Sequence, residues 1–517
     1  MTATWAYQEA EKVLALVQKK GKTIATFECG FGPSGSPHIG TVAEMLRTRM
    51  VIEAFCDITR NLAPPGEHPE SYYQINWVLF ADNLDSLRKV PNNVPNPKEM
   101  EQYLGIPVCD IPDPWGRDKS FAEHNIRDLH EALARFGYTL NDYSLFRASD
   151  MYRPMRSGQP GLFNDAIIDF AFKANEIKDI VTHDYKDERT ASYCPFLPIS
   201  KNRKTQIDLY NWDIQEIDTN KGPIPMVLYY HTEPNSTEMN THPILNGGCK
   251  LQWKADWPLR WYALDVDYEM HGKDLLGSAQ VGDRIMRLMN REPPIHMMYE
   301  LFLNEEGQKI SKSDGSNDAL QQWTDYTLAE VLMHFLSLNP RKSRKLHFGI
   351  IPQTTDAWLS DQGESVSPIS FSMLLNLVSI TNTEDPDLIW DYIDGYSSGA
   401  NKEQYPVLDL LIQKAINYYR DYILPNKNYR DPTANEMDAL NALASALGSV
   451  NIDEDEITKI VYDIGKQFYG ENKDSLRNFF QMIYEVLMGQ TSGPRLPVFI
   501  LLFGVNQFIN LIRTKTQ

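Results

Sequence analysis

The 517-residue sequence has few cysteines, no long apolar run and fewer basic than acidic residues. Its five cysteines form no close pair, which argues against a disulfide framework and against a C-x-x-C zinc motif. No apolar run approaches the ~20 residues of a membrane-spanning helix. The N-terminal stretch lacks the apolar core of a signal peptide, and neither an internal repeat nor a low-complexity tract is present. These absences predict a cytoplasmic globular protein.

Acidic residues outnumber basic ones, 69 to 50, which gives a formal net charge of −19. This balance ordinarily disfavours nucleic-acid binding, because phosphate contacts need lysine and arginine. A local basic stripe can nevertheless bind phosphates while the rest of the surface stays acidic. Two candidate stripes, each of which could equally be an ordinary solvated surface run, are Lys201, Arg203 and Lys204 and then Arg341, Lys342, Arg344 and Lys345.

The N-terminal region predicts a strand, a glycine loop and a helix. Residues 23–29 form an apolar run with strand character, after which Ser36 can cap a helix and Pro37 can occupy its first turn. This is the opening unit of a parallel α/β sheet, which binds ligands at the carboxyl ends of its strands. Residues 73–82 predict the next strand. The apolar stripe expected on the helix consists of Ile39, Val42, Leu46 and Met50.

Further along, the pattern changes twice. Residues 116–245 combine helical stretches, such as 121–137 and 163–181, with a polar, tyrosine-rich region that predicts an insertion. The α/β character returns over 250–290. Beyond residue 325 the sequence predicts helices throughout, the last of them over 495–515.

The glycine loop raises the question of which nucleotide it binds, since residues 30–35 spell G-F-G-P-S-G. In a dinucleotide site, a second strand ends in a ribose-binding carboxylate about 20 residues after the glycines. Here that distance falls within or just after the helix, around residues 53–57, and the strand that ends at Asp82 comes too late. An NAD-dependent dehydrogenase is therefore excluded.

Two short motifs indicate a different nucleotide. Pro37-His38-Ile39-Gly40 lies at a helix N-terminus, where a histidine and the free N–H groups favour a phosphate and where Gly40 lets a nucleotide approach the backbone. His38 could instead only cap the helix or pack. K-I-S-K-S, residues 309–313, forms a cationic loop that can stabilise charge on departing pyrophosphate, although such a string can also be a solvated loop. In this order the two motifs resemble the HIGH and KMSKS signatures of class I aminoacyl-tRNA synthetases.

Within that class the sequence resembles the lysyl-tRNA synthetase family over nearly the whole chain, through "GFGPSGSPHIGT", "DPWGRDKSFAEH", "PFLPI", "GGCKLQWKADWPLRWYALDVDYEMHGKD" and "KISKSDG". The resemblance implies that lysine and ATP give lysyl-adenylate, and that lysine is then transferred to the lysine tRNA. It also implies an α/β Rossmann-like catalytic domain and an all-α C-terminal domain. The expected parts are two halves of the catalytic domain (1–115 and 246–300), a connective insertion (116–245), the KISKS loop with a stem-contact segment (301–348) and a helical anticodon-binding domain (349–517).

The resemblance also implies roles for particular residues. His38, Lys309 and Lys312 would be catalytic by stabilising the phosphates, because the substrate carboxylate itself attacks and no side-chain nucleophile is needed. Mg²⁺ would accompany ATP. The expected ATP-binding residues are Gly30, Pro37, His38, Gly40, Lys309, Ser311, Lys312 and Ser313.

A lysine pocket must pair an ammonium group and shelter a methylene stem, which a buried carboxylate with aromatic walls can do. Trp253, Trp257 and Trp261 are spaced by four, so they could equally form one face of a core helix. The residues expected to bind the amino acid are Glu28, Cys29, Asp82, Trp253, Asp256 and Tyr268.

Departures from the family's pattern leave other functions open. Cys29 stands where relatives commonly have threonine. Leu275 follows Gly-Lys-Asp where relatives tend to have histidine. Ser200 and Arg203 stand where many members have a zinc-binding C-x-x-C, so no metal is expected. One alternative is a paralogue that activates another amino acid, although about 170 C-terminal residues remain for tRNA binding. Another is a catalytically silent RNA-binding protein, which the presence of both signatures disfavours.

Overall fold

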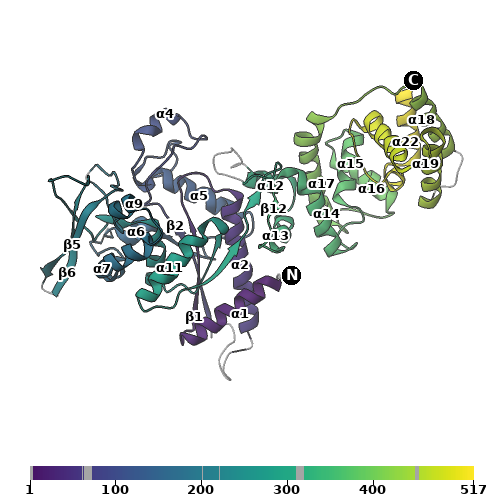
Figure 1. Cartoon of the computed structure of the whole chain (residues 1–517). Coiled ribbons are helices and arrows are strands. Elements are labelled where there is room, and N and C mark those ends of the chain that lie inside the picture. Colours follow the sequence, from purple (N-terminus) through teal and green to yellow (C-terminus); the bar gives the residue numbers. More distant parts are fainter. Residues whose placement is uncertain are drawn as a thin grey trace. The chain divides into compact units, whose positions relative to one another are not determined.

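The computed structural model describes residues 4–60, 62, 73–155, 157–200, 202–219, 222–309, 319–448 and 453–516. The chain divides into two compact units. The first comprises Met1–Leu320 and Leu336–Leu346, and the second comprises Gln321–Phe335 and His347–Gln517. The first unit contains the parallel sheet, and the second is built from helices (Figure 1).

A five-stranded parallel sheet in the order β10-β9-β1-β2-β3 forms the centre of the first unit. The chain runs from β1 outward to β2 and β3, and later adds β9 and β10 on the other side of β1. The order in which strands are added therefore reverses between β1 and β9. Parallel α/β sheets bind ligands at such a switch point, outside the carboxyl ends of the strands. The strands are β1 (Ile24–Phe31), β2 (Gln74–Ala81), β3 (Ser144–Arg147), β9 (Tyr268–Gly272) and β10 (Ile295–Tyr299).

Helices cover both faces of this sheet. On one face, α1 (Thr4–Lys19) packs beside α2 (Ile39–Thr59), and Phe55 of α2 contacts Phe27 of β1 with ring centroids 5.7 Å apart. On the other face, α10 (Trp253–Leu264) packs against α11 (Leu276–Leu288). Strand residues alternate between faces, so Phe27 points toward α2 and Glu28 toward α10.

The predictions for β1, β2 and the following helix are confirmed, apart from the start of the helix. All four residues of the predicted apolar stripe are buried in α2. The helix begins at Ile39, with His38 rather than Ser36 as its N-cap, because the His38 ring accepts a hydrogen bond from the Thr41 amide.

The region after β2 differs from its prediction at two points. β3 comes from the range 116–245 that was predicted to be an insertion, so the sheet takes in more of the chain than expected. The helix predicted over 163–181 is interrupted at Lys173, whose backbone (φ −110°) leaves the helical region. Beyond it, β5 and β6 form a long antiparallel hairpin at the edge of the first unit (Figure 1). The elements from β2 to β8 include α4 (Pro97–Met100), α5 (Phe121–Ala134), α6 (Ala148–Tyr152), α7 (Asn164–Phe172), α8 (Ala174–Thr182), α9 (Asp187–Ser192), β4 (Phe196–Pro198), β5 (Tyr210–Thr219), β6 (Gly222–His231), β7 (Asn240–Pro243) and β8 (Cys249–Leu251).

The last segments of the first unit are β11 (Phe302–Leu303) and β12 (Arg344–Lys345), which pair in parallel. Two helices, α12 (Ala319–Tyr326) and α13 (Ala329–Ser337), lie between them in the sequence. The helices that follow are α14 (Ile351–Gln362), α15 (Phe371–Thr381), α16 (Pro386–Tyr396), α17 (Pro406–Tyr418), α18 (Ala434–Leu447), α19 (Glu454–Tyr469), α20 (Lys473–Ile483) with its π-helical continuation η8 (Tyr484–Met488), α21 (Leu496–Phe503) and α22 (Val505–Thr516).

The single helix predicted over 495–515 is wrong, because α21 and α22 meet at an angle of 102°. Gly504 makes this bend, since its φ of +90° is a conformation that favours glycine. In the part of the chain that the structure describes, no single helix is long and apolar enough to cross a membrane; α21 and α22 meet that test only when joined across the bend.

The packing of α10 on α11 gives a stability prediction. A Cβ atom at Gly282 would lie 2.4 Å from Cζ3 of the fully buried Trp261, whereas at Gly277 of the same helix it would meet nothing within 4 Å. We expect Gly282→Ala to lower the free energy of unfolding by about 1–3 kcal/mol through overpacking, measured by urea denaturation. Gly277→Ala is the matched control and should leave the urea midpoint unchanged or higher; equal effects of the two changes would contradict the packing argument.

Candidate active site

His38 lies at the carboxyl edge of the sheet, between β1 and α2. Its Nδ1 accepts the backbone N–H of Thr41 at 3.2 Å. A neutral imidazole that accepts at Nδ1 carries its proton on Nε2, which can donate to a phosphate oxygen. The helix N-terminus favours an anion at the same place. Capping the helix and contacting a phosphate are therefore compatible functions of this one side chain.

The two predicted glycines each make room for a neighbouring side chain. A Cβ atom at Gly40 would lie 2.8 Å from Cε1 of His38, so the absence of a side chain allows the imidazole its position. At Gly30 a Cβ atom would lie 3.2 Å from Nη1 of Arg260. Pro37 directly precedes His38 in the loop. Close approach of a nucleotide to these glycines stays a prediction.

Lys309, the first lysine of the KISKS segment, is joined to the end of β9. Its ammonium lies 2.8 Å from Oδ2 of Asp274, in the turn after β9, and both side chains are about half exposed. An exposed ion pair contributes little stability, so Lys309 can exchange Asp274 for a phosphate at small cost. The predicted residues Ser311, Lys312 and Ser313 lie outside the described residues.

Glu28 and Asp82, both predicted for the amino-acid site, come together around the buried guanidinium of Arg260. Nη1 of Arg260 lies 3.2 Å from Oδ2 of Asp82 and 3.6 Å from Oε1 of Glu28. Within the described chain, neither oxygen of Glu28 accepts a hydrogen bond. Burial raises the pKa of Asp82 to about 7 although Arg260 opposes this, and burial raises the pKa of Glu28 well above its usual value.

The three tryptophans of α10 have different environments. Trp257 donates to Glu269 of β9 at 2.9 Å, and Trp261 donates to the same carboxylate. Burial raises the pKa of Glu269 to about 7, opposed by Arg260. Trp257 and Trp261 thus have the core position that their spacing allowed. Trp253, only partly buried, stacks on Trp257 at 5.0 Å and lies 5.3 Å from the Arg260 guanidinium.

Asp256 belongs to a second buried network on this face. Its carboxylate accepts from Tyr152 and from the buried Lys250, whose ammonium lies 3.2 Å from Oδ2. Lys250 also pairs with Asp85 at 2.6 Å. The structure therefore gives Asp256 two protein partners already.

Cys29 and Tyr268 lie on the opposite face of the sheet from Glu28. Tyr268 is completely buried beside Phe27, with ring centroids 5.7 Å apart and its hydroxyl 3.7 Å from the sulfur of Met297. Cys29 is also fully buried, and burial raises the pKa of its thiol. The structure does not bring these two residues together with Glu28 and Asp82.

Glu44 of α2 is a carboxylate that the sequence analysis did not single out. It is partly exposed at the switch point and accepts a hydrogen bond from Tyr299, the last residue of β10. Burial raises its pKa to about 8, although the bond from Tyr299 opposes this. Its charge acts on Glu28 and Cys29, which places all three near the end of β1.

One group of side chains has ligand types and spacing that suit a metal. Asp113, Asp118 and His124 each offer an atom within 4.8 Å of the others. The Asp113 carboxylate already accepts three backbone N–H bonds, from Trp115, Arg117 and Asp118. His124 is stacked on Trp115 at 4.0 Å. These contacts explain why the three side chains lie together: they stabilise the turn that leads into α5.

Arg260 and Glu44 were not predicted for the site, although each has a signal in the sequence. Arg260 lies one helical turn after Asp256, on the helix that carries the tryptophans, so its side chain reaches the same sheet edge. Glu44 follows Gly40 by one turn of α2. The contact of Glu44 with Tyr299 spans 255 residues and has no local signal.

A parallel sheet whose strand order reverses at β1, with a histidine-capped helix on one side of the switch and a lysine-bearing loop on the other, is the nucleotide-binding fold that class I aminoacyl-tRNA synthetases share. A family model described as tRNA synthetases class I (K) matches residues 3–372, well over half of the chain. The chain belongs to this family.

Relatives in two bacteria match along almost their whole length. The lysine–tRNA ligase of Rickettsia bellii (strain RML369-C) is 33% identical over 543 aligned residues, covering 99% of this chain and 97% of the relative. That of Roseobacter denitrificans is 34% identical over 536, covering 98% and 95%. Among solved structures, a glutamate tRNA ligase from Elizabethkingia meningosepticum aligns with 95% of this chain and 99% of its own at 11% identity, with a TM-score of 0.38.

The raised pKa of Glu44 predicts that stability falls as pH rises. The folded state holds the proton up to about pH 8, whereas an unfolded glutamate releases it near 4.5, so the stabilisation is complete below pH 4.5 and is lost toward pH 8. The slope is at most about 1.4 kcal/mol per pH unit. We expect Glu44→Gln to flatten the pH dependence of urea unfolding. Glu53→Gln, at an exposed position of the same helix, should leave the pH dependence of unfolding as in the wild type. An unchanged slope in Glu44→Gln would contradict the raised pKa of Glu44.

Proposed function

We propose that this protein is an ATP-dependent lysine–tRNA ligase, which forms lysyl-adenylate and transfers lysine to the lysine tRNA. The observation that carries the proposal is the group of carboxylates near the switch point, where Glu28 and Asp82 share Arg260 and the charge of Glu28 acts on Glu44. Lysine carries two ammonium groups, and carboxylates at the end of β1 and along α2 match that charge. The relatives named above support the same activity.

In the first step, a carboxylate oxygen of lysine attacks the α-phosphorus of ATP. An oxygen–phosphorus bond forms, the bond to the β-phosphate bridge breaks, and pyrophosphate leaves. The contribution of the chain is positioning and charge stabilisation. His38 donates from Nε2, the first N–H groups of α2 face the phosphates, and Lys309 and Lys312 neutralise the charge that develops on pyrophosphate.

In the second step, a ribose hydroxyl at the 3′ end of tRNA attacks the carbonyl carbon of the adenylate, and AMP leaves. Mg²⁺ would accompany ATP, with phosphate oxygens and water as its main ligands. Asp274, a half-exposed carboxylate beside Lys309, suits a water-mediated contact with that ion.

The amino-acid pocket that we propose is bounded by Glu28, Asp82 and Trp253 on the α10 face and by Glu44 near Cys29. Glu44 is the carboxylate that we expect to meet an ammonium group of lysine, because it is partly exposed and its hydrogen bond from Tyr299 engages one carboxylate oxygen. Asp256 and Tyr268, which were also predicted for this pocket, would act from behind it by supporting Lys250 and β9.

We propose further that residues 301–348 contact the acceptor stem, that 349–517 bind the anticodon region, and that the enzyme works in the cytoplasm. In the basic cluster 341–345, Arg341 pairs with the buried Glu9 at 2.9 Å, and Lys345 donates to the carbonyl of Glu305 at 2.8 Å. Lys342, which is exposed, is the residue of this cluster that we expect to reach tRNA.

Pyrophosphate exchange and tRNA charging, measured with each of the 20 amino acids and with or without tRNA, test the proposed activity. Lysine should support both reactions. Exchange with another amino acid alone would assign the protein to a different substrate, and no exchange with any amino acid would indicate a silent RNA-binding protein.

The second signature predicts a separable effect of one lysine. Lys312→Ala should lower the rate of adenylate formation by about 10²–10³-fold, because the ammonium contacts charge that develops in the transition state. The equilibrium binding of lysine should change little. Lys19→Ala, at an exposed site on α1, is the matched control. Parallel losses in lysine affinity and rate in Lys312→Ala would contradict this function.

A further inference from the structure

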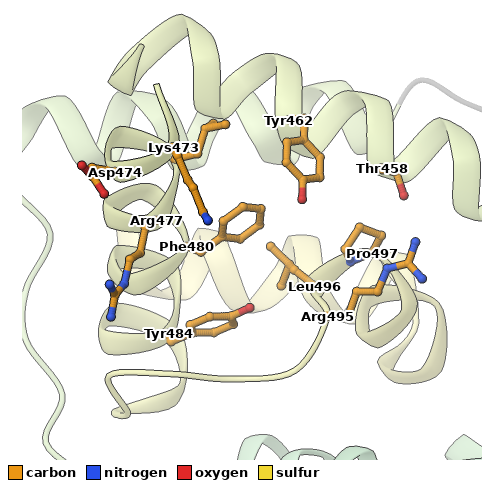
Figure 2. Close-up of a pocket in the computed structure, with 11 residues that line it drawn as sticks. Thr458, Tyr462, Lys473, Asp474, Arg477, Phe480, Tyr484, Arg495, Leu496 and Pro497 are labelled. Atoms are coloured by element: carbon orange, nitrogen blue, oxygen red, sulfur yellow. The ribbon is translucent and has the colours of Figure 1, made fainter. Parts of the chain in front are cut away.

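The second unit contains a cavity of about 730 Å³ between α19, α20 and the start of α21 (Figure 2). Its volume is in the range of small-molecule pockets. Three aromatic rings, Tyr462, Phe480 and Tyr484, line it together with three cations, Lys473, Arg477 and Arg495. The cavity therefore combines apolar ring surface with positive charge.

One continuous helical stripe supplies two of the three rings and two of the three cations. Lys473, Arg477, Phe480 and Tyr484 follow one another at intervals of four, three and four residues, so they share one face of α20 and its continuation η8. Cations occupy the N-terminal end of the stripe and aromatic rings the C-terminal end. Figure 2 shows Lys473 reaching toward the ring of Phe480. The helix N-terminus adds to the positive potential at the cationic end.

The aromatic rings are held in place, and Tyr462 keeps exposed surface. Tyr462 of α19 is 40% exposed and meets Phe480 edge to face, with centroids 5.5 Å apart. Tyr484 is buried and donates from its hydroxyl to the carbonyl of Pro494 at 2.5 Å. Gly493 permits this position, since a Cβ atom there would lie 2.5 Å from the Tyr484 ring. The wall is thus fixed, and the face of Tyr462 is available for stacking.

The charges around the cavity favour a polyanion. Among the described residues, one carboxylate, Asp474, lines it against three cations, in a chain with 19 more acidic than basic residues. Arg495 pairs with Glu454 at 3.1 Å, and Lys473 and Arg477 are exposed and have no ion-pair partner among the residues that the structure describes. Phosphates attract such cations, and aromatic faces stack on bases of any sequence.

We propose that this cavity binds one unpaired nucleotide of the tRNA, with the base stacked on Tyr462 and the adjoining phosphates paired with Lys473 and Arg477. The assignment rests on the proposed function, because that function makes tRNA the substrate. An acidic peptide would satisfy the cations but leave the open ring face without a stacking partner. A base with its flanking phosphates uses both halves of the stripe.

Binding of a lysine tRNA transcript to the full-length protein tests the assignment, with lysine charging measured on the same preparations. Tyr462→Leu and Arg477→Gln should each raise the Kd for tRNA about 10-fold or more, while kcat at saturating tRNA stays close to that of the wild type. Tyr396→Leu and Arg513→Gln, at exposed positions of the same unit outside the cavity, are the matched controls. Thermal unfolding of each variant establishes that it is folded.

Salt dependence separates the two halves of the cavity. Arg477→Gln should reduce the slope of log Kd against log salt concentration by about 1, which corresponds to one lost phosphate contact. Tyr462→Leu should weaken binding and leave the slope unchanged. A hairpin containing only the paired acceptor stem should bind both variants as it binds the wild type.

The outcomes distinguish this proposal from the proposed function. If the wild type charges tRNA with lysine but Tyr462→Leu and Arg477→Gln bind tRNA as well as their controls do, the nucleotide site is wrong and the ligase stands. If the wild type charges no lysine but both variants lose affinity for tRNA, the ligase is wrong and the nucleotide site stands. An equal loss of affinity for the acceptor-stem hairpin would also overturn the site.

Discussion

Arg260 places one buried positive charge where Glu28, Asp82, Asp256 and Glu269 approach one another, and the carboxyl edge of the sheet depends on it. Isolated buried carboxylates either take up protons or destabilise the fold. The guanidinium offsets part of their repulsion and joins the ends of β1 and β2 to α10. Gly30 belongs to the same arrangement, because any side chain there would press on the guanidinium.

This compensation is incomplete, and the surplus acidity is what makes the edge suitable for a cationic substrate. Asp82 and Glu269 have pKa values near 7 and Glu44 near 8, so at neutral pH these groups are partly protonated. A bound ammonium group favours their charged forms, which couples substrate binding to proton release. The tryptophan bonds to Glu269 hold one of these carboxylates in position, so that Glu28 and Glu44 remain the adaptable members.

Local patterns predicted the parts of the fold whose cause is local. The apolar run of β1, the glycine loop and the stripe of α2 are contiguous, and each formed as predicted except that His38 replaced Ser36 as the cap. The bend at Gly504 was missed because the flanking residues are apolar on both sides and a glycine inside such a run has no local sign of its φ. Likewise β3 is only four residues long and pairs with β2 more than 60 residues earlier, so no short window identifies it as part of the sheet.

The candidate site likewise divides into residues with a local signal at an element's end and residues without one. Glu28, Asp82 and His38 were indicated by their places at strand ends and at a helix start. Arg260 and Glu44 come to the site only when distant segments pack together.

The proposed reaction requires two opposite charges to be met within one small site, and the fold separates them by the order of its strands. The carboxylates gather at the ends of β1 and β2 and on α2, where lysine would lie. The phosphates would face the start of α2 and the KISKS segment, whose first lysine is anchored by Asp274 beyond the end of β9. Because the ion pair of Lys309 with Asp274 is exposed, ATP can compete for this lysine without disturbing the buried network. In a chain with more acidic than basic residues, the cations that we propose for phosphate contacts are local: Lys473 and Arg477 at the N-terminal end of α20, and Lys309 in the second signature.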